Sequence, residues 1–345
     1  MSRMRILIVG GTGFIGPPVA RLLAERGHAV TLFHRGQTEA DLPPDINHIS
    51  GDRHDLAAFR DEFKRLAPEV VLDMICYTES DAQASVQAFG GVAARLVTAS
   101  SMDVYRAYGR LLRIESGPPD ATASAEDAPL RQTMYPHKAI AKSPEDFARS
   151  YEKIFVERVV MNDTRLRGTI LRLPAVYGPG DPYHRTFEYL KRMDDGRRAI
   201  LIEERQARWR WTRGYVENVA GAIALAVTDD RAAGRIYNVG EPDALTEAEW
   251  CRSIGDAAGW RGPILAAPKE MMPGHLIAPY DWEHHIVGDT TRMRDELGYA
   301  ESVSRQDALK KTIEWERAHP PEQADPARFD YAAEDAALAK LGHGN

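Results

Sequence analysis

The sequence predicts an α/β protein whose core is a doubly wound parallel sheet with a smaller mixed α/β lobe attached. Three observations predict this class: a short apolar run that leads into a glycine-rich turn near the start of the chain, strand and helix patterns that alternate through the first half, and a length of 345 residues of which 43% are hydrophobic. This length and composition fit one large unit with a buried core and an attached lobe. Alternating strands and helices imply right-handed crossovers and hence a parallel sheet.

The first half of the chain consists of successive strand and helix patterns. Residues 6–9 form a continuous apolar run, typical of a strand buried on both faces, and apolar residues at helical spacing follow until a predicted stop at Gly27. The further elements predicted in this half are strands at 29–33, 46–50, 70–75 and 95–99 and helices at 56–66 and 80–89.

The pattern breaks between about 107 and 150, where a Gly117-Pro118-Pro119 turn and a small, acidic stretch predict an exposed insertion, either a loop or a lid. The later predictions are helices at 144–162, 216–228, 246–258, 290–297 and 304–318 and strands at 168–173, 199–202, 235–239 and 264–266. We therefore divide the chain into a sheet domain (1–180, with the insertion), a substrate lobe interleaved with the end of the sheet (181–320), and a tail (321–345) that is a surface helix or partly disordered.

Composition excludes several classes of protein. The net charge of −7 gives no global attraction to nucleic acid or to an anionic membrane, so we expect neither partner. The two cysteines, Cys76 and Cys251, lie far apart and indicate a reducing compartment. No apolar run approaches the roughly 20 residues of a membrane span, and the N-terminal apolar run is too short for a signal peptide. We expect a cytoplasmic protein.

A metal site is not expected either. Glu283-His284-His285, with His275 nearby, contains ligand types, but adjacent histidines diverge on a strand or a helix.

The glycine turn lies between the first predicted strand and the first predicted helix, where unpaired N–H groups and the positive end of the helix dipole suit a pyrophosphate. Glycines let the backbone turn sharply and approach the phosphates, and the last glycine lets the helix pack closely on the strand. This arrangement predicts a Rossmann-type dinucleotide site, the alternative being a purely structural turn. The residues predicted to hold the dinucleotide here are Gly10, Thr12, Gly13, Phe14, Ile15 and Gly16.

The end of the second strand predicts which dinucleotide binds. An acidic residue there would hold the ribose hydroxyls of NAD, but this chain has His34 and Arg35. A guanidinium suits a 2′-phosphate, so we expect NADP, with NAD as the alternative. Asp52 follows the third strand and lies where an adenine amino group is met, and Arg53 offers a second cation near the same phosphate.

With the glycine turn, Asp52, Ser100-Ser101, the 151–157 segment and the turn over 177–181 in this order, the chain resembles the extended short-chain dehydrogenase/reductase family, the NAD-dependent epimerases and dehydratases of nucleotide sugars. The similarity runs from about residue 4 to 300. The sequence of residues 27–36 is most similar to an atypical branch of this family, which includes plastid RNA-binding proteins.

In that family a serine or threonine after the fifth strand, a tyrosine and a lysine do the chemistry. The lysine holds the nicotinamide ribose and lowers the tyrosine pKa, the tyrosine moves a proton to or from a substrate oxygen, and the hydroxyl orients that oxygen. The resemblance implies Ser101, Tyr151 and Lys153 as catalytic residues, with Lys153 and Ser100 also at the cofactor.

The spacing of the tyrosine and the lysine departs from the family pattern, which has three residues between them. Here Arg149 occupies the expected tyrosine position and Tyr151 lies only two residues before Lys153. Two residues on a regular helix differ by roughly 200°, so both cannot face the nicotinamide if both are helical. Three explanations remain open: Tyr151 lies before the regular helix begins, Tyr135 from the insertion takes its place, or the proton-transfer function is lost.

Two further segments are expected to line the cofactor cleft. Ile75 and Cys76 follow the fourth strand at the carboxyl edge, where ligands bind in such sheets. Pro174 and Val176 follow the sixth strand and resemble the segment whose backbone contacts the carboxamide end of the nicotinamide. Cys76 is not expected to be a nucleophile, because no histidine stands in a partner arrangement.

A phosphorylated small molecule is the expected substrate. The lobe supplies cations for a diphosphate, and among them we select Arg185 and Arg213 as substrate-binding residues. Trp209 and Trp211 alternate with arginines at a strand-like period, which predicts aromatic side chains on one face; the alternative is that both tryptophans simply pack inward.

The expected function is that of an NAD(P)-dependent epimerase, dehydratase or reductase acting on a nucleotide sugar or a similar hydroxyl/carbonyl substrate by hydride transfer. One alternative is a cofactor-binding regulatory or scaffold protein without catalysis, which the irregular tyrosine spacing favours. The other is an RNA-binding protein, which the net charge disfavours. The sequence leaves the oligomeric state open, and a homodimer is one possibility.

Overall fold

A seven-stranded parallel sheet forms the centre of the computed structural model, which describes residues 3–143, 146–323 and 325–343. The strands lie in the order β10-β6-β5-β4-β1-β2-β3. Their bounds are β1 (Arg5–Val9), β2 (Ala29–His34), β3 (Asn47–Ser50), β4 (Val70–Asp73), β5 (Arg95–Ser101), β6 (Arg167–Leu173) and β10 (Ile236–Asn238). The chain winds outward from β1 in one direction and from β4 in the other, so the doubly wound sheet is confirmed. The carboxyl ends of β1 and β4 mark the switch point at which such sheets bind ligands.

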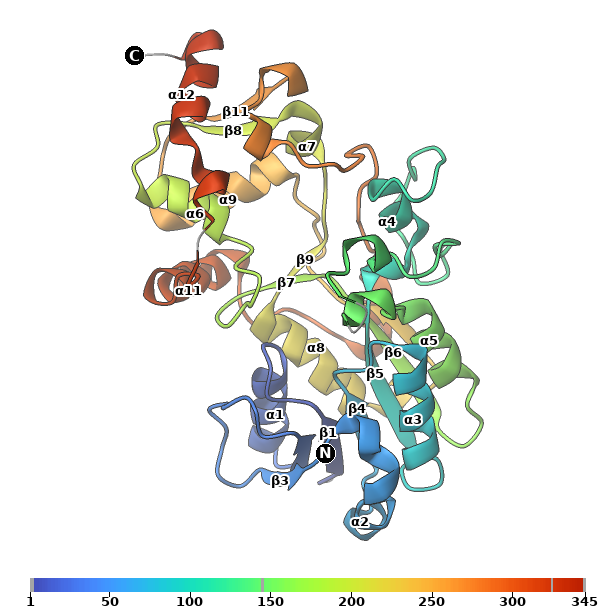
Figure 1. Cartoon of the computed structure of the whole chain (residues 1–345). Coiled ribbons are helices and arrows are strands. Elements are labelled where there is room, and N and C mark those ends of the chain that lie inside the picture. Colours follow the sequence, from blue (N-terminus) through green and yellow to red (C-terminus); the bar gives the residue numbers. More distant parts are fainter. Residues whose placement is uncertain (1–2, 144–145, 324, 344–345) are drawn as a thin grey trace.

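Helices cover both faces of this sheet (Figure 1). Alternate residues of β1 point to opposite faces: Ile6 and Ile8 belong to one apolar cluster, Leu7 and Val9 to the other. The first cluster packs under α1 (Gly16–Glu25) and α8 (Val216–Thr228). The second cluster is covered by α2 (Arg60–Leu66), α3 (Glu79–Phe89) and α5 (Lys153–Asn162).

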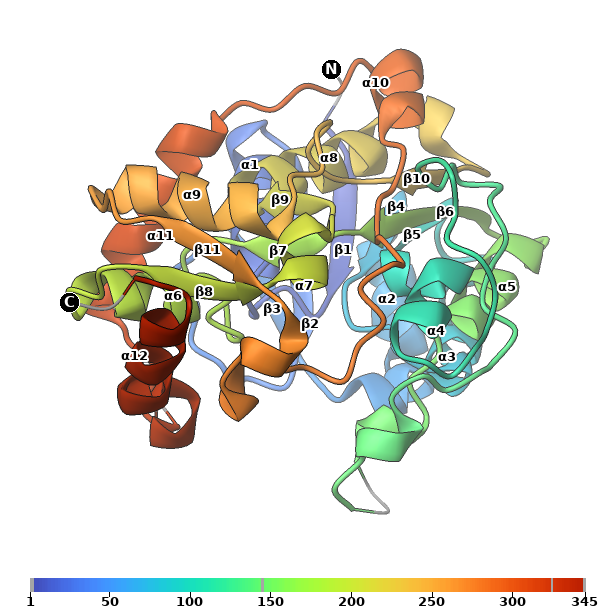
Figure 2. The ribbon, with the colours of Figure 1, turned by 90° about the horizontal axis from the view of Figure 1, so that it is seen from above.

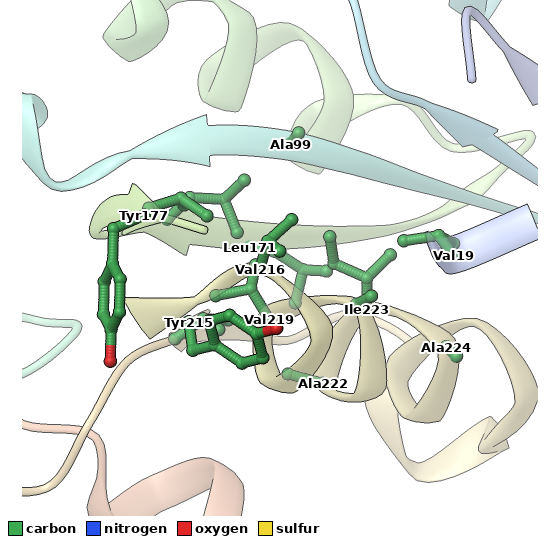
Figure 3. Close-up of a cluster of buried hydrophobic side chains, with 14 of the residues drawn as sticks. Val19, Ala99, Leu171, Tyr177, Tyr215, Val216, Val219, Ala222, Ile223 and Ala224 are labelled. Atoms are coloured by element: carbon green, nitrogen blue, oxygen red, sulfur yellow. The ribbon is translucent and has the colours of Figure 1, made fainter. Parts of the chain in front are cut away.

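Helix α8 joins the sheet to the lobe. Figure 3 shows Val216, Val219 and Ile223 of this helix directed toward the strand that holds Leu171 and toward Val19 of α1. The helix follows the short strand pair of β7 (Ala175–Tyr177) and β9 (Arg213–Tyr215), which leads from the sheet into the lobe. The sheet domain and the entrance to the lobe therefore share one apolar core.

The lobe is a mixed α/β layer around a second strand pair, β8 (Ile200–Glu203) and β11 (Ile264–Ala267) (Figure 2). The tail contains a helix that packs on this lobe, where the buried guanidinium of Arg192 donates to the Glu334 carboxylate at 2.8 Å. The remaining helices are α4 (Arg106–Leu111), α6 (Phe187–Asp194), α7 (Glu204–Arg208), α9 (Glu247–Ala258), α10 (Thr291–Leu297), α11 (Arg305–Ala318) and α12 (Tyr331–Lys340).

In the 107–162 region one prediction was wrong and another holds only in part, for residues such as 116–123, which are mostly exposed. The predicted helix over 144–162 begins only at Lys153 as α5, and residues 144–145 lie outside the described part of the chain. The insertion is not only an exposed loop, because it contributes the fully buried Arg131, which pairs with the buried Glu152 at 3.0 Å. Glu152 also caps α5 by accepting from the N–H of Ile154. A long-range ion pair therefore helps determine where this helix starts.

Candidate active site

A cavity of about 630 Å³ lies between the glycine turn, the end of β2, the turn after β3 and the segment after β4. Gly10 and Gly11 adopt φ of +90° and +92°, which only glycine takes without strain. A Cβ on Gly16 would stand 2.4 Å from the Cα of Gly11, so this glycine permits the close contact between the turn and α1. These three glycines are required by the backbone itself.

Gly13 differs from them, because it is exposed and a Cβ there would meet no atom within 4 Å. Within the described residues, no hydrogen bond engages the backbone N–H of Phe14 or Ile15. Pro17 and Pro18 open α1 and have no N–H, so the free donors at this helix start belong to the turn. The turn thus offers an open glycine and two free N–H groups to an anion, and the half-buried Thr12 lines the cavity beside them. A dinucleotide fits this cradle.

At the end of β2, Arg35 is exposed and lines the cavity, and no salt bridge in the described chain uses its guanidinium. His34, in contrast, has hydrogen-bond partners within the chain. Its Nδ1 accepts from the N–H of Gly36 at 3.1 Å, and its Nε2 lies 2.8 Å from His48 Nδ1. Burial, and next the neighbouring His48, lower the pKa of His34. Arg35 is therefore the free cation at this end of the cavity, and His34 is a neutral neighbour.

The turn after β3 places Asp52 and Arg53 in different roles. One oxygen of Asp52 accepts from the N–H of His54 at 2.9 Å and caps a short 3-10 helix, while the side chain stays half-buried at the cavity. Arg53 is buried, and its guanidinium pairs with Asp73 and Asp81, both at 3.1 Å. Arg53 lines the cavity as expected, but Asp73 and Asp81 already neutralise its charge.

The segment after β4 contributes one of its two predicted residues to the cavity wall. Ile75 lines the cavity, but the Cys76 side chain is fully buried, and burial raises the pKa of its thiol. The prediction that Cys76 lines the cleft was therefore wrong for its side chain. Its backbone carbonyl instead accepts from the Lys153 ammonium at 2.7 Å.

Lys153 and Tyr151 meet at the carboxyl end of β5. Lys153 is the first residue of α5, and Tyr151 precedes the helix, so the two-residue spacing does not place them on opposite helix faces. The ammonium of Lys153 is buried, lies 5.9 Å from the centre of the Tyr151 ring and also donates to the carbonyl of Ala99 at 2.8 Å. Burial lowers the pKa of Lys153. The structure therefore agrees with the first of the three explanations for the spacing, in which Tyr151 lies before the regular helix begins.

Asp103 and His137 are the two residues of this cluster that sequence reasoning missed. The Tyr151 hydroxyl donates to Asp103 at 2.7 Å, and the same carboxylate oxygen lies 3.9 Å from His137 Nε2. The His137 ring packs on the Tyr151 ring with 5.0 Å between centres. Asp103 comes two residues after Ser101, a signal that could have been read as a carboxylate at the carboxyl edge of β5. His137 lies in the insertion, where no local pattern marks it.

In this environment the pKa of Tyr151 is shifted in the direction opposite to the expected one. Burial, and next the negative charge of Asp103, raise the pKa of Tyr151 well above its ordinary value of 10.0, whereas the nearby Ser101 hydroxyl acts in the opposite direction. The lysine effect that the resemblance implied, a lowered tyrosine pKa, is therefore not what this site shows. At neutral pH Tyr151 is a protonated phenol.

The two serines at the end of β5 point to opposite sides, as successive strand residues do. The half-buried Ser101 is beside Tyr151 and caps the following turn by accepting from the N–H of Asp103. The buried Ser100 donates to Glu157 at 2.6 Å, and Glu157 in turn pairs with the buried Arg172. The Ser100 hydroxyl is thus engaged in an ion-pair network on the far side of the strand from Ser101, so the expected cofactor contact of Ser100 stays a prediction.

The other candidates lie around this cluster. The ring of Tyr135 packs against Phe155 at 5.9 Å, and Phe155 lies roughly 200° around α5 from Lys153. Pro174 is half-buried between β6 and β7. Val176 is buried, and its carbonyl accepts from the Arg185 guanidinium at 3.0 Å.

A second cavity, of about 370 Å³, opens on the lobe side of β7. Both arginines selected for a substrate phosphate line it, and both already have partners. Arg185 pairs with the buried Asp181 at 2.6 Å, and Arg213 pairs with Glu247. Neither is a free cation in this arrangement.

Within the described ranges, no group of three histidine, cysteine or acidic side chains has the arrangement of a metal site. Over the same part of the chain, no helix combines the length and the apolar character needed to cross a bilayer.

Comparison with known proteins decides the family. The model of the NAD dependent epimerase/dehydratase family matches residues 6–240, well over half of the chain. The chain belongs to the NAD-dependent epimerase/dehydratase family. It is therefore a member of a family of NAD-dependent enzymes.

Curated relatives of this family member differ in what their names state. A 2′-dehydrokanamycin reductase of Streptomyces kanamyceticus is 24% identical over 77% of this chain and 70% of the relative. A dTDP-glucose 4,6-dehydratase of Streptomyces niveus is 26% identical over 91% of this chain and 93% of the relative. The chloroplast stem-loop binding protein of 41 kDa b of Arabidopsis thaliana is 23% identical over 86% and 75%.

Solved structures show the same fold. The UDP-glucose 4-epimerase of Thermus thermophilus, in complex with NAD, superposes with a TM-score of 0.64 at 22% identity and covers 92% of this chain and 100% of that chain. WbmG of Bordetella bronchiseptica, in complex with NAD and UDP, gives a TM-score of 0.67 at 18% identity and covers 92% and 96%. The epimerase/dehydratase fold thus extends over nearly the whole chain.

Proposed function

We propose that the protein is an NADP-dependent oxidoreductase, epimerase or dehydratase that exchanges hydride with a hydroxyl or carbonyl substrate. One observation supports this above all others: Ser101, Tyr151 and Lys153 lie together at the carboxyl end of β5, although their spacing departs from the family pattern. The glycine turn lies at the carboxyl end of β1, which is separated from β5 by β4. Nucleotide sugars and similar hydroxyl or carbonyl compounds are the substrates that this chemistry serves.

Each side chain of the cluster has a distinct role in this proposal. When bound, the nicotinamide supplies or accepts the hydride. Lys153 has three N–H donors, of which two hold the carbonyls of Cys76 and Ala99, and the third remains for a ribose hydroxyl. Ser101 orients the substrate oxygen. The two carbonyl contacts fix the ammonium in place before any ligand binds.

Tyr151 is the proton donor. Like any tyrosine it is protonated at neutral pH and so has a proton to give in the reduction of a carbonyl, although burial and Asp103 raise its pKa and make it a weaker acid. The O–H bond of the Tyr151 phenol would break, and its proton would pass to the substrate oxygen. The phenolate then regains a proton from the solvent side, where the half-buried His137 stands 3.9 Å from Asp103.

The choice of NADP rests on Arg35. It is an exposed guanidinium without an acidic partner in the described chain, at the end of β2 where an acidic residue would favour NAD. A 2′-phosphate would find paired donors there.

A cofactor-binding regulatory protein without catalysis is the second candidate. Two observations favour it. The Tyr151 hydroxyl already donates to Asp103, and two of the three N–H groups of the Lys153 ammonium already donate to backbone carbonyls. Cytoplasmic location and a possible homodimer stay predictions of the sequence, and RNA binding stays the alternative that the net charge disfavours.

Two measurements on the full chain test the proposal. Calorimetry with NADPH, NADP, NADH and NAD should give binding, tightest for the phosphorylated pair, and no binding of any of the four would contradict it. Turnover should then be seen in one of two assays: loss of NADPH absorbance with sugar and other carbonyl compounds for a reductase, or product analysis of sugar substrates incubated with the NADP-bound protein for an epimerase or dehydratase, which returns the hydride and leaves the absorbance unchanged. Dinucleotide binding without turnover of any compound would favour the regulatory candidate.

A further inference from the structure

The second cavity, on the lobe side of β7, has walls made largely of aromatic rings. Trp209, Trp211 and Trp282 form one group, with 5.4 Å between the centres of the first two rings and 5.0 Å between Trp209 and Trp282. The indole N–H of Trp209 donates to the carbonyl of His284, so its polar group is already satisfied and its ring serves as an apolar surface. Trp250 closes another side, packed on Tyr177 at 4.9 Å.

The arginines of this cavity are all neutralised. Three line it, and each has its own carboxylate partner: Arg185 pairs with Asp181, Arg213 with Glu247, and Arg328 with Glu188. The charges of this group cancel.

Two of these pairs resist opening. The side chain of Asp181 is 2% exposed and that of Glu247 is 12% exposed. The Glu247 carboxylate also accepts from the Tyr189 hydroxyl at 2.8 Å, and the guanidinium of Arg213 stacks on Trp250 at 4.5 Å. A phosphate that took either arginine would leave a buried carboxylate without its cation.

The cavity reaches the reacting cluster through Tyr108. This residue lines the cavity, its ring lies 5.9 Å from His137, and the His137 ring lies 5.0 Å from Tyr151. Two rings, those of Tyr108 and His137, therefore connect the wall of this cavity to Tyr151, the proposed proton donor.

We propose that the substrate is an uncharged carbohydrate ring, a sugar or glycoside without a phosphate group, held between the tryptophans. Sugar rings are apolar on their faces and polar at their edges, which matches indole walls with a polar rim of Gln206, Glu188 and tyrosine hydroxyls. The volume of about 370 Å³ is at the small end of the roughly 300–1,000 Å³ of ligand pockets, as a compact ring compound requires. The inference rests on the proposed function for the reaction and narrows its substrate class.

Calorimetry of the full chain saturated with NADPH tests this, with methyl glucoside, 4-nitrophenyl glucoside, kanamycin, UDP and UDP-glucose as probes. At least one of the two uncharged glucosides should bind, and UDP should bind no more than a tenth as tightly. Trp211→Ala should weaken glycoside binding at least tenfold, while Trp260→Ala, a lobe tryptophan outside the cavity, should leave it within twofold. UDP or UDP-glucose binding tenfold tighter than both glucosides would overturn the inference, as would binding of kanamycin alone, which is cationic, or of none of the probes.

The failure of this inference can be told apart from failure of the proposed function. The glycoside titration is repeated without NADPH, because the cavity is formed by the chain alone. Glycoside binding with no dinucleotide binding would remove the proposed reaction and keep the carbohydrate site, whereas NADPH binding with preference for UDP would do the reverse.

Discussion

The cavity at the glycine turn and the cavity on the lobe side of β7 differ in how their charged groups are paired. At the glycine turn, Arg35 has no acidic partner in the described chain and the N–H groups of Phe14 and Ile15 are unused. At the lobe cavity, Arg185 and Arg213 are paired with Asp181 and Glu247. The first cavity is prepared for an anion before the anion arrives, and the second is electrically balanced.

This difference shows why counting arginines does not locate a phosphate site. The sequence contains more arginines in the lobe than near the glycine turn, yet among the arginines that line these two cavities only Arg35 lacks an acidic partner in the described chain. Pairing within the fold, which depends on residues distant in sequence, decides which cations remain available to a ligand.

The largest expected effect separates chemistry from binding. Tyr151→Phe removes the proton donor and should lower kcat by roughly 10²–10⁴-fold, since that is the usual contribution of a positioned acid or base. NADPH affinity by calorimetry should change less than twofold. Tyr135→Phe is the matched control and should retain full turnover; a loss in Tyr135→Phe equal to that in Tyr151→Phe would transfer the role to the insertion.

The next largest expected effect tests whether Arg35 in the first cavity binds the 2′-phosphate of NADPH. Arg35→Ala should weaken NADPH binding by about 10–100-fold, because a charge-assisted contact contributes about 1.5–3 kcal/mol. NADH binding should hardly change. Arg65→Ala, an exposed arginine on α2, is the control. Equal losses for NADPH and NADH in Arg35→Ala would show that Arg35 does not read the 2′-phosphate.

A smaller loss of dinucleotide affinity is expected from a substitution in the glycine turn that leaves the fold intact. Gly13→Ala adds a methyl group into open space, where the pyrophosphate is expected, and should weaken binding of both dinucleotides by about tenfold, or about 1.4 kcal/mol. Gly274→Ala also adds a methyl group to open space, far from the turn, and serves as the control. Unchanged dinucleotide affinity in Gly13→Ala would place the pyrophosphate elsewhere.

Asp103→Asn tests the electrostatics of the proton donor. The negative charge of Asp103 helps to raise the pKa of Tyr151, so removing it should let that pKa fall toward 10.0. Tyrosinate absorbance in an alkaline titration measures this, with Tyr151→Phe as the subtraction that assigns the signal. An unchanged pKa in Asp103→Asn would mean that burial alone sets it.

The smallest effect concerns stability in mild acid. Burial is the largest cause of the lowered pKa of His28 and of His284, so the unfolded chain takes up protons first as pH falls below 6.5. The free energy of unfolding therefore decreases as pH drops below that value, and it gains nothing further from these groups at higher pH. His28→Gln should make Tm less dependent on pH, by no more than about 4 °C. A steeper dependence in the variant would contradict this.

Much of the fold could be predicted because local patterns encode it. Burial on both faces requires the continuous apolar run of β1, which is visible in the sequence. Backbone geometry requires glycine at positions 10, 11 and 16, which is visible in the same way. The start of α5 could not be predicted in this way. It depends on Glu152, whose partner Arg131 is 21 residues away in the insertion.

The site was predictable to the same extent. The positions of Tyr151 and Lys153 follow from a recognisable segment, but the charge around them does not. Asp103 and His137 approach Tyr151 only because β5 and the insertion fold over the same point, and Arg53 is neutralised by Asp73 and Asp81 through contacts that no spacing reveals.

A crystal structure of the protein with NADPH tests the central claim most directly. The account predicts the Tyr151 hydroxyl within reach of nicotinamide C4, the Lys153 ammonium on the nicotinamide ribose and the 2′-phosphate on Arg35. A nicotinamide that lies away from Tyr151, with the Tyr151 hydroxyl still donating to Asp103, would contradict it.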